Sequence, residues 1–373
     1  MTTRRTAFLL WLAVGVAGAP SGASESRAPS ALHADVDRRV AAIEPKVIAW
    51  RRDFHEHPEL GNRETRTAGI VADHLRALGL EVHTGVGKTG VVGILKGGRP
   101  GQVVALRADM DALPVTEQVD LPFASKARGT WNGQEVGVMH ACGHDNHVAI
   151  LMGTAEVLAG LREQLPGTVK FLFQPAEEGP PAGEEGGAEL MIRDGALDGP
   201  RPAAIFGLHV MPAPVGTIGW RAGGIFAAAD TFRVVVRGRQ THGAQPWNGV
   251  DPIVVAAQIV LGLQTIVSRQ TDLTLAPAVV SVGILRGGLR SNIIPEQVEM
   301  EGTIRTYDEP VRDGIHRRVR QTAEAIARSA DAEAEVSIET GNPVTFNDPA
   351  LMRRMLPTLD RVAGADKVRE IPA

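Results

Sequence analysis

The stretch TVKFLFQPAEE, residues 168–178, decides the fold, because an apolar, β-rich run ends there at two adjacent carboxylates. Similar short runs occur at residues 91–97 (VVGILKG), 103–109 (VVALRAD) and 203–210 (AAIFGLHV). A helical pattern precedes these runs at residues 64–79, and helical patterns separate them at residues 146–161 and 186–197. Strands that alternate with helices in this way indicate an α/β domain with a mostly parallel sheet.

Polar side chains follow several of these predicted strands. Asp109 and Asp111 end one run, Glu177 and Glu178 end another, and His209 ends a third. In parallel α/β sheets, ligands bind beyond the carboxyl ends of the strands. We therefore expect these residues to converge on one edge of the sheet.

A different order of elements begins after about residue 216. The pattern predicts strand 229–238, helix 251–270, strands 278–286 and 297–306, helix 310–330 and strand 334–340. This β-α-β-β-α-β order is ferredoxin-like and is self-sufficient as a domain. We assign residues 216–340 to an inserted α+β domain, and residues 32–215 and 341–373 to the α/β domain.

The N-terminus predicts export. Arg4 and Arg5 precede an apolar run and then small residues, which is typical of a secretory signal peptide ending at Ala23. We expect a periplasmic or secreted protein. Because no second apolar stretch looks long enough to span a bilayer, we expect no membrane contact after cleavage. A net charge of -4 without a basic cluster argues against a nucleic-acid partner.

The only cysteine, Cys142, lies two positions before His144 at the start of a predicted helix. Thiolate and imidazole are preferred ligands of zinc and neighbouring transition metals. A lone cysteine is also commonly a small buried apolar residue. His140, Asp145 and His147 crowd the same turn, and so many polar groups favour a metal site over a core position.

Glu177 and Glu178 repel each other unless a cation neutralises one of them. Because consecutive side chains diverge, one metal ligand and one general base is a natural division, although a solvated pair of loop residues remains an alternative. His209 could also be a plain surface histidine. We expect Asp109 and Asp111 to orient a ligand rather than to bind metal directly.

Several motifs occur in an order that resembles the M20 family of metallopeptidases and amidohydrolases, in particular the hippurate and indole-acetyl-amino-acid type. The resemblance spans residues 50–345 and rests on RRDFHEHPEL, ALRADMDALPVTE, MHACGHDNH, FLFQPAEEG, GLHV, QTHGAQPWNGVDP and SNIIPEQVEMEGTIRT. It implies two divalent metal ions (zinc, manganese, nickel or cobalt). Cys142 would bridge them, His144 and His209 would complete one, Glu178 would hold the other, and Glu177 would be the general base.

The resemblance makes residues 32–215 and 341–373 the metal-binding catalytic domain and residues 216–340 a lid and dimerisation domain, and it also assigns residues of that second domain. His242 resembles the lid histidine that reaches the active site of the partner subunit in a homodimer and supports the oxyanion. Asn292 and Arg305 resemble lid residues that hold the free carboxylate of the substrate. From the residues alone, His242 and Asn292 could equally serve turns, and Arg305 could be an exposed strand residue. His55 and His57 are read as capping or packing residues at a helix end.

The chain departs from the family pattern at its C-terminal end. Family members continue for roughly 60 residues, which carry an acidic segment and a last histidine ligand, whereas residues 341–373 contain no histidine. We therefore expect a C-terminally truncated fragment, and an inactive one if the missing ligand is essential.

The resemblance implies a metal-dependent amidohydrolase that cleaves the amide bond of N-acyl amino acids. A carboxypeptidase or dipeptidase of the same family is the nearest alternative. A non-catalytic, metal-binding dimeric protein is a second, although such a protein would need no general base. A Cys142 nucleophile with His144 as its base is a third, which the spacing disfavours because side chains two residues apart at a turn rarely meet.

Overall fold

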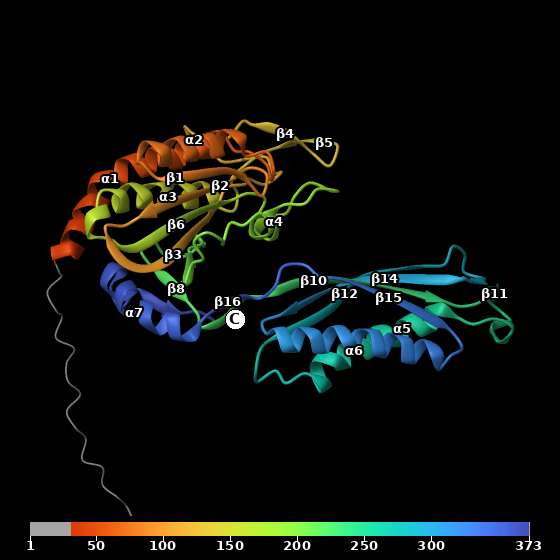
Figure 1. Ribbon diagram of the computed structural model, residues 1–373. Helices are drawn as coiled ribbons and strands as arrows, with labels where there is room; N and C mark the ends of the chain where they lie inside the picture. The colour runs from red at the N-terminus through yellow and green to blue at the C-terminus, as the bar shows by residue number, and fades with distance from the viewer. Residues whose placement is uncertain (1–30, 373) are drawn as a thin grey trace, which may run out of the picture. The chain divides into compact units, whose positions relative to one another are not determined.

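The computed structural model describes residues 31–372 (Figure 1). The predicted signal peptide, residues 1–23, lies outside this range. Contacts between Cα atoms divide the chain into two compact units, with the boundary between Met211 and Pro212. The two units are described one at a time.

The first unit contains a five-stranded sheet in the order β1-β2-β6-β3-β7. Its strands are β1 (Glu81–Val86), β2 (Gly90–Lys96), β3 (Arg99–Asp109), β6 (Pro166–Gln174) and β7 (Ala204–Gly207). Only β2 runs against the others, because it is antiparallel to both β1 and β6 while β3 is parallel to β6 and β7. The expected mostly parallel sheet is therefore confirmed.

Helices cover both faces of this sheet, as Figure 1 shows. On one face, α1 (Ala31–Glu56), α2 (Thr65–Ala77) and α3 (His144–Ala159) pack on the sheet through a core that includes Phe54, Leu75, Met152 and Phe171. On the other face, α4 (Gly187–Arg193) packs through Met191. Burial on both faces explains why β6 reads as a continuous apolar run rather than an alternating one.

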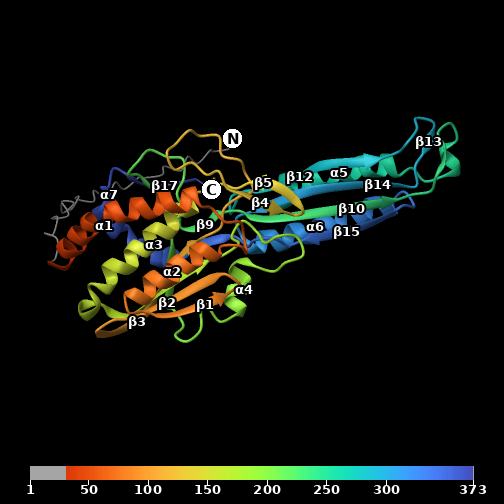
Figure 2. The same cartoon turned by 90° about the horizontal axis from the view of Figure 1, so that it is seen from above.

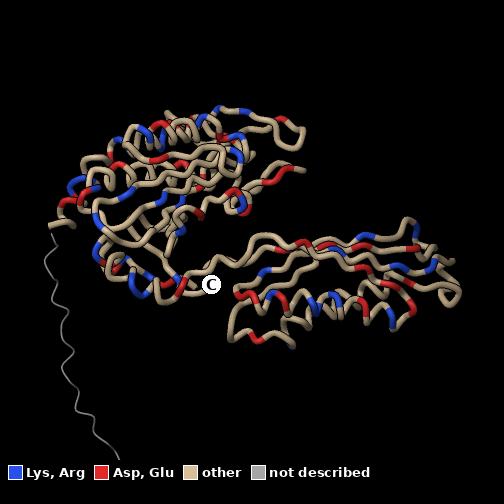
Figure 3. The backbone as a smooth tube through the Cα atoms, viewed as in Figure 1, with Lys and Arg blue, Asp and Glu red and all other residues tan. Residues whose placement is uncertain are grey.

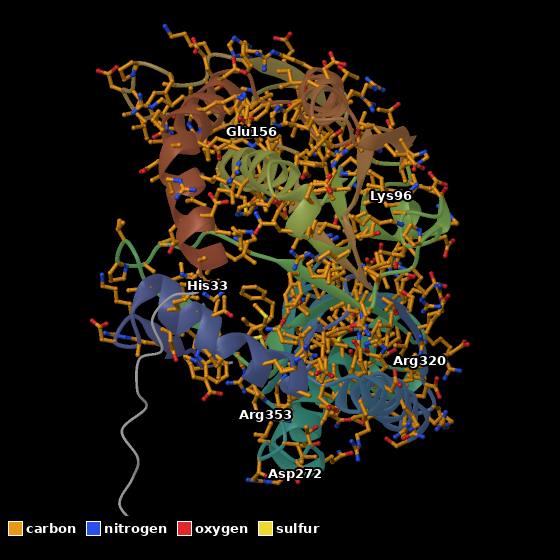
Figure 4. The ribbon with its side chains drawn as sticks, turned by 60° about the vertical axis from the view of Figure 1, so that its left-hand side comes forward. His33, Lys96, Glu156, Asp272, Arg320 and Arg353 are labelled. Carbon is orange, nitrogen blue, oxygen red and sulfur yellow. The ribbon has the colours of Figure 1, made fainter. Side chains whose placement is uncertain are left out.

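Ion pairs join the helices of the first unit at the surface. Glu156 of α3, labelled in Figure 4, accepts from Lys46 of α1 at 2.6 Å. The remaining elements of this unit are the hairpin β4 (Arg128–Trp131) and β5 (Gln134–Gly137) and the 3₁₀ turn η1 (Arg162–Gln164).

The second unit contains a four-stranded antiparallel sheet in the order β12-β14-β10-β15, with two helices on one face (Figure 2). Its elements are β10 (Ala228–Arg237), α5 (Pro252–Gln270), β12 (Ala278–Gly287), β14 (Gln297–Thr306), α6 (Glu309–Arg328) and β15 (Glu333–Glu339). This is the ferredoxin-like order, with boundaries within two residues of the predicted ones. Aspartates begin both helices, since Asp251 and Asp308 accept from backbone amides of the first turn.

Short paired segments complete the second unit. The pairs are β8 (Ile218–Trp220) with β17 (Val368–Glu370), β9 (Gly223–Phe226) with β16 (Thr345–Asn347), and β11 (Thr241–His242) with β13 (Ile293–Ile294); η2 (Pro246–Asn248) and α7 (Pro349–Ala363) accompany them. Residues 345–370 thus pair with residues 218–226. The predicted domain limits at 216 and 340 stay predictions.

The expectation that no second apolar stretch could span a bilayer was wrong as a statement of length and composition. Helix α5 is long and apolar enough to do so. One face of α5, including Ile259, Leu263 and Ile266, is fully buried in the core against the four-stranded sheet. That face makes α5 a core helix of the second unit, where a high apolar content is ordinary. Figure 3 shows basic and acidic residues interspersed along both units.

Candidate metal centre

The strands of the first sheet bring the predicted residues to one edge. Strand β3 ends at Asp109 directly beside Gln174, the last residue of β6, and β7 ends at Gly207 on the other side of β3. The expected convergence of polar side chains at this edge is confirmed. Three groups of potential ligand atoms form there, each with its atoms within 4.8 Å of one another: Cys142, His144 and His209; His144, Glu177 and Glu178; and Asp109, His144 and His147.

His144 belongs to all three groups and is fully buried. Its Nδ1 lies 2.8 Å from the carbonyl oxygen of Asp111 and 3.1 Å from the carboxylate Oδ1 of the same residue. Two acceptors at Nδ1 mean that this nitrogen carries a proton and donates it. The lone pair of Nε2 is then directed at the remaining groups of the centre.

That Nε2 atom is buried and has no hydrogen-bond partner within residues 31–372. The oxygens nearest to it belong to Asp109 and Glu177, each at 3.8 Å, and to Glu178 at 3.9 Å. A buried acceptor facing three further acceptors is costly unless a cation or a proton lies among them. Although burial lowers it, the hydrogen bond to Asp111 and the nearby carboxylates raise the pKa of His144 to about 9. The centre therefore requires positive charge.

Cys142 lies with its Sγ 3.4 Å from Nε2 of His209. Burial, a hydrogen bond with Glu178 and the charges of Glu178 and Glu177 raise the pKa of its thiol to about 12. A nucleophilic cysteine needs the opposite shift, so the nucleophile alternative finds no support. A coordinating thiol is deprotonated by the metal it binds. Metal binding is therefore the role in which we expect Cys142 to be a thiolate.

His209 directs its Nε2 atom at the centre, as His144 does. Its Nδ1 donates to the carbonyl oxygen of Val210 at 2.7 Å, which leaves Nε2 beside Cys142. A cysteine, two histidines and a glutamate pair form a donor set that suits zinc and neighbouring divalent transition metals. Together with the orphaned Nε2 of His144, this donor set fits the two ions that the resemblance implies.

Asp111 connects two of the candidate ligands. Besides its contacts with the His144 ring, its Oδ2 accepts from the backbone amide of Glu178 at 3.0 Å. Asp109 is also fully buried and is paired with Arg107 at 2.6 Å and with His147. Burial would raise the pKa of Asp109, but the His147 hydrogen bond and Arg107 hold it well below its usual value. Asp109 is thus an ionised anchor for the surrounding side chains, and Asp111 joins the His144 ring to the backbone of Glu178.

Sequence reasoning left His147 without a role and gave His55 only a capping or packing role. His147 accepts from the amide of Val210 at 2.9 Å and so fixes the segment after β7; its position three residues after His144 on one helix face was the available signal. His55 is buried at the end of α1, as a packing residue would be, and it also contacts Asp145 at 2.8 Å and Glu117 at 3.1 Å. Nothing local to residue 55 predicts these distant partners.

The remaining predicted site residues lie in the second unit, where one of them, Arg305, lies apart from the other two. His242 and Asn292 meet at the β11–β13 pair, where the amide of Gly243 donates to the carbonyl oxygen of Asn292 at 2.8 Å. Arg305 lies near the other end of β14, with its guanidinium 2.9 Å from the carbonyl oxygen of Ile304. Eight strand positions separate Gln297, the start of β14, from Arg305, which corresponds to roughly 26 Å along the strand. One copy of this unit therefore does not gather all three residues.

Comparisons with known proteins agree with this geometry. The profile of peptidase family M20/M25/M40 matches residues 105–373. The chain is 44% identical over 309 residues to the N-acetylcysteine deacetylase of Bacillus subtilis, covering 82% of this chain and 77% of that protein. It is 41% identical over 327 residues to thermostable carboxypeptidase 1 of Saccharolobus solfataricus, covering 87% and 80%. The crystal structure of the Bacillus subtilis YXEP protein, described as a dinuclear metal-binding peptidase from the M20 family, superposes with a TM-score of 0.73 at 38% identity, covering 89% and 83%.

Proposed function

The chain belongs to peptidase family M20/M25/M40, and we propose that it uses two divalent metal ions to hydrolyse the amide bond of N-acyl amino acids. The products are a carboxylic acid and a free amino acid. The observation that carries the proposal is the buried Nε2 of His144, which faces three carboxylate oxygens beside Cys142 and His209. The N-acetylcysteine deacetylase among the relatives supports this substrate class.

The side chains of the centre divide the work. Cys142, His144 and His209 would hold one ion, and Cys142 and Glu178 would hold the other. When bound, the ions acidify a water molecule and polarise the amide carbonyl. Glu177 accepts the proton of the attacking water at a carboxylate oxygen and then delivers it to the leaving amine nitrogen. Zinc, manganese, nickel and cobalt are the candidate ions that the resemblance implies, and the cysteine and histidines of the donor set suit zinc.

His242 is suited to support the oxyanion of the tetrahedral intermediate. The amide of Ala244 donates to its Nδ1 at 3.0 Å, so the neutral ring carries its proton on the exposed Nε2. A positioned donor of this kind stabilises developing negative charge on the substrate oxygen. The Asn292 amide and the Arg305 guanidinium provide donors for the free carboxylate of the substrate.

The separation of Arg305 from His242 and Asn292 supports a homodimer, because a site that needs all three can draw them from two copies. The pairing surface that we assign is β12, one of the two edge strands of the four-stranded sheet, where Val279 is 49% and Leu285 is 53% exposed. An unpaired edge strand with apolar side chains is a template for another chain. We propose that two copies join through this unit.

Complementation tests the shared site. Glu177→Gln and His242→Ala chains, each inactive alone, should regain about a quarter of wild-type activity when co-expressed, since one site in each mixed dimer then holds both intact residues. Sedimentation of each variant as a dimer is the control. A mixture no more active than its components would contradict the arrangement.

A carboxypeptidase is the second candidate function, because a relative with that name is 41% identical to this chain. Incubating the metal-loaded product of the whole open reading frame with N-acetyl amino acids and with dipeptides, and measuring released amino acid, separates the two. We expect faster release from the N-acetyl amino acids. Faster release from dipeptides would establish the peptidase, and no release from either would contradict both.

We also propose export to the periplasm or the medium. The charged, apolar and small-residue segments of residues 4–23 support it. N-terminal sequencing of the protein from its native host should begin at Ser24; a start at Met1 would contradict cleavage.

A further inference from the structure

The backbone that presents Glu177 and Glu178 passes through a strained residue. Ala176 has a φ of 46°, in the left-handed region, and is buried. A non-glycine residue keeps this conformation only where its surroundings hold it. Two carboxylates hold this turn: the amide of Ala176 donates to Oε1 of Glu64 at 2.8 Å, and the amide of Glu178 donates to Oδ2 of Asp111 at 3.0 Å.

Glu64 reaches this turn from a distant part of the chain and is fully buried. It precedes α2 directly but does not cap that helix. Glu59 does so instead, accepting from the amides of Arg66 at 2.9 Å and Thr67 at 2.8 Å. The second oxygen of Glu64 accepts from the hydroxyl of Thr89 at 2.6 Å. Both oxygens of Glu64 are therefore occupied, one by the start of β2 and one by the turn.

Neighbours of Glu64 hold the same loop. A Cβ at Gly61 would lie 3.0 Å from the carbonyl oxygen of Gly179 and 3.3 Å from the Cα of Ala176, so residue 61 packs directly against the turn. Asn62 donates from Nδ2 to Oε2 of Glu184 and to the carbonyl oxygen of Glu185, each at 3.0 Å. Residues 61–64 thus fasten the loop at both of its ends.

We propose that Glu64 is a positioning residue for the catalytic centre, which fixes the amide of Ala176 and thereby the directions of Glu177 and Glu178. The proposal rests on the proposed function, because it concerns the placement of that general base and that ligand. Burial raises the pKa of Glu64 to about 7 despite its hydrogen bonds. Burying a carboxylate costs free energy that an apolar side chain at the same place would not cost, which agrees with a role beyond packing.

Variants of Glu64 separate positioning from charge and from stability. Glu64→Ala removes the acceptor of the Ala176 amide and should lower kcat about 10- to 100-fold at saturating metal, with little change in KM. Glu64→Gln keeps a carbonyl oxygen for that amide and a donor for Thr89, so it should retain kcat. Glu64→Asp keeps the charge but shortens the side chain by one methylene, which moves the carboxylate away from the Ala176 amide, so its kcat should fall.

Glu59→Ala is the matched control, because Glu59 lies with Glu64 in the segment between α1 and α2. It removes only the cap of α2, so it should lower the melting temperature and leave kcat unchanged. Thr89→Val removes the other partner of Glu64 and should retain most of kcat.

Hydrogen–deuterium exchange supplies a readout without turnover. In metal-free protein, the peptide that contains Ala176 should exchange faster in Glu64→Ala and Glu64→Asp than in wild type or Glu64→Gln. Unchanged exchange and unchanged kcat in Glu64→Ala would overturn the proposal, as would an active Asp variant beside an inactive Gln variant. If the Ala variant does not fold, the Gln and Asp pair decides. Absent turnover in wild type would contradict the proposed function alone, since the exchange comparison still judges Glu64.

Discussion

Replacing Glu177 with glutamine should lower kcat about 10²- to 10⁴-fold while leaving the metal content unchanged. Glutamine has the shape of glutamate but cannot accept the proton of the attacking water. The side chain of Glu177 is 32% exposed, with Oε2 3.8 Å from Nε2 of His144, so it borders both the ligands and the solvent. Kinetics at saturating metal, combined with metal analysis of the same samples, measure both quantities.

Glu178→Gln is the matched control, because the two glutamates are adjacent and nearly equidistant from His144. We expect this variant to lose bound metal as well as activity, since it removes a ligand. The opposite outcome, with metal lost from the Glu177 variant and kept by the Glu178 variant, would exchange the two roles. Equal loss of metal from both would contradict a dedicated general base.

Replacing Asp230 with asparagine should lower the free energy of unfolding of the second unit by about 3–5 kcal/mol at pH 7. Asp230 is fully buried in β10 and accepts from Arg312 of α6 at 2.6 and 2.9 Å and from His316 at 2.7 Å. The variant leaves a buried guanidinium with only the half-exposed carboxylate of Glu309, 3.1 Å away, as its counter-charge. Urea unfolding followed by a probe in the second unit measures the loss.

The same carboxylate predicts a dependence on pH. Burial would raise the pKa of Asp230, but hydrogen bonds from Arg312, His316 and the amide of Gly341 lower it below its usual value. A depressed pKa in the folded state means that its stabilisation is complete above the unfolded-state value, near 3.8, and is lost as the pH falls through the folded-state pKa. Wild type should therefore lose more stability than Asp230→Asn on acidification below about pH 4.

The control for Asp230 is a double variant. Adding Arg312→Met to Asp230→Asn removes the buried guanidinium as well, so the double variant should be more stable than Asp230→Asn alone. If the single variant loses less than about 1 kcal/mol of unfolding free energy, the Asp230–Arg312 pair contributes no more than a surface ion pair does. That result would contradict a stabilising buried pair.

Hydrophobic periodicity predicted most of the fold. The ferredoxin-like core of the second unit followed from alternating and helical patterns alone, as the predicted strand 297–306 and helix 251–270 show, because each of its elements buries one face against a single layer. Helix α7 and the short paired strands of this unit were not predicted. Strand ends in the first unit predicted where Asp109, Glu177 and His209 would meet, since parallel strands place their carboxyl ends at one edge.

Long-range partners were beyond prediction. Glu64 and Ala176 are 112 positions apart, and Asp230 and Arg312 are 82 apart, so no local pattern connects them. The strain at Ala176 was equally hidden, because alanine gives no sign of a left-handed conformation. The distance between Arg305 and His242 depends on strand register, which the motifs do not encode.

The most direct test of the central claim is a metal titration of the metal-free product of the whole open reading frame, followed by the release of amino acid from an N-acetyl amino acid. We predict no release without metal and a rise in rate that is complete at about two ions per chain, as expected for a dinuclear centre. Cys142→Ala should abolish both the binding of metal and the release of amino acid. Hydrolysis by the metal-free protein, or full activity in the Cys142→Ala variant, would contradict the account.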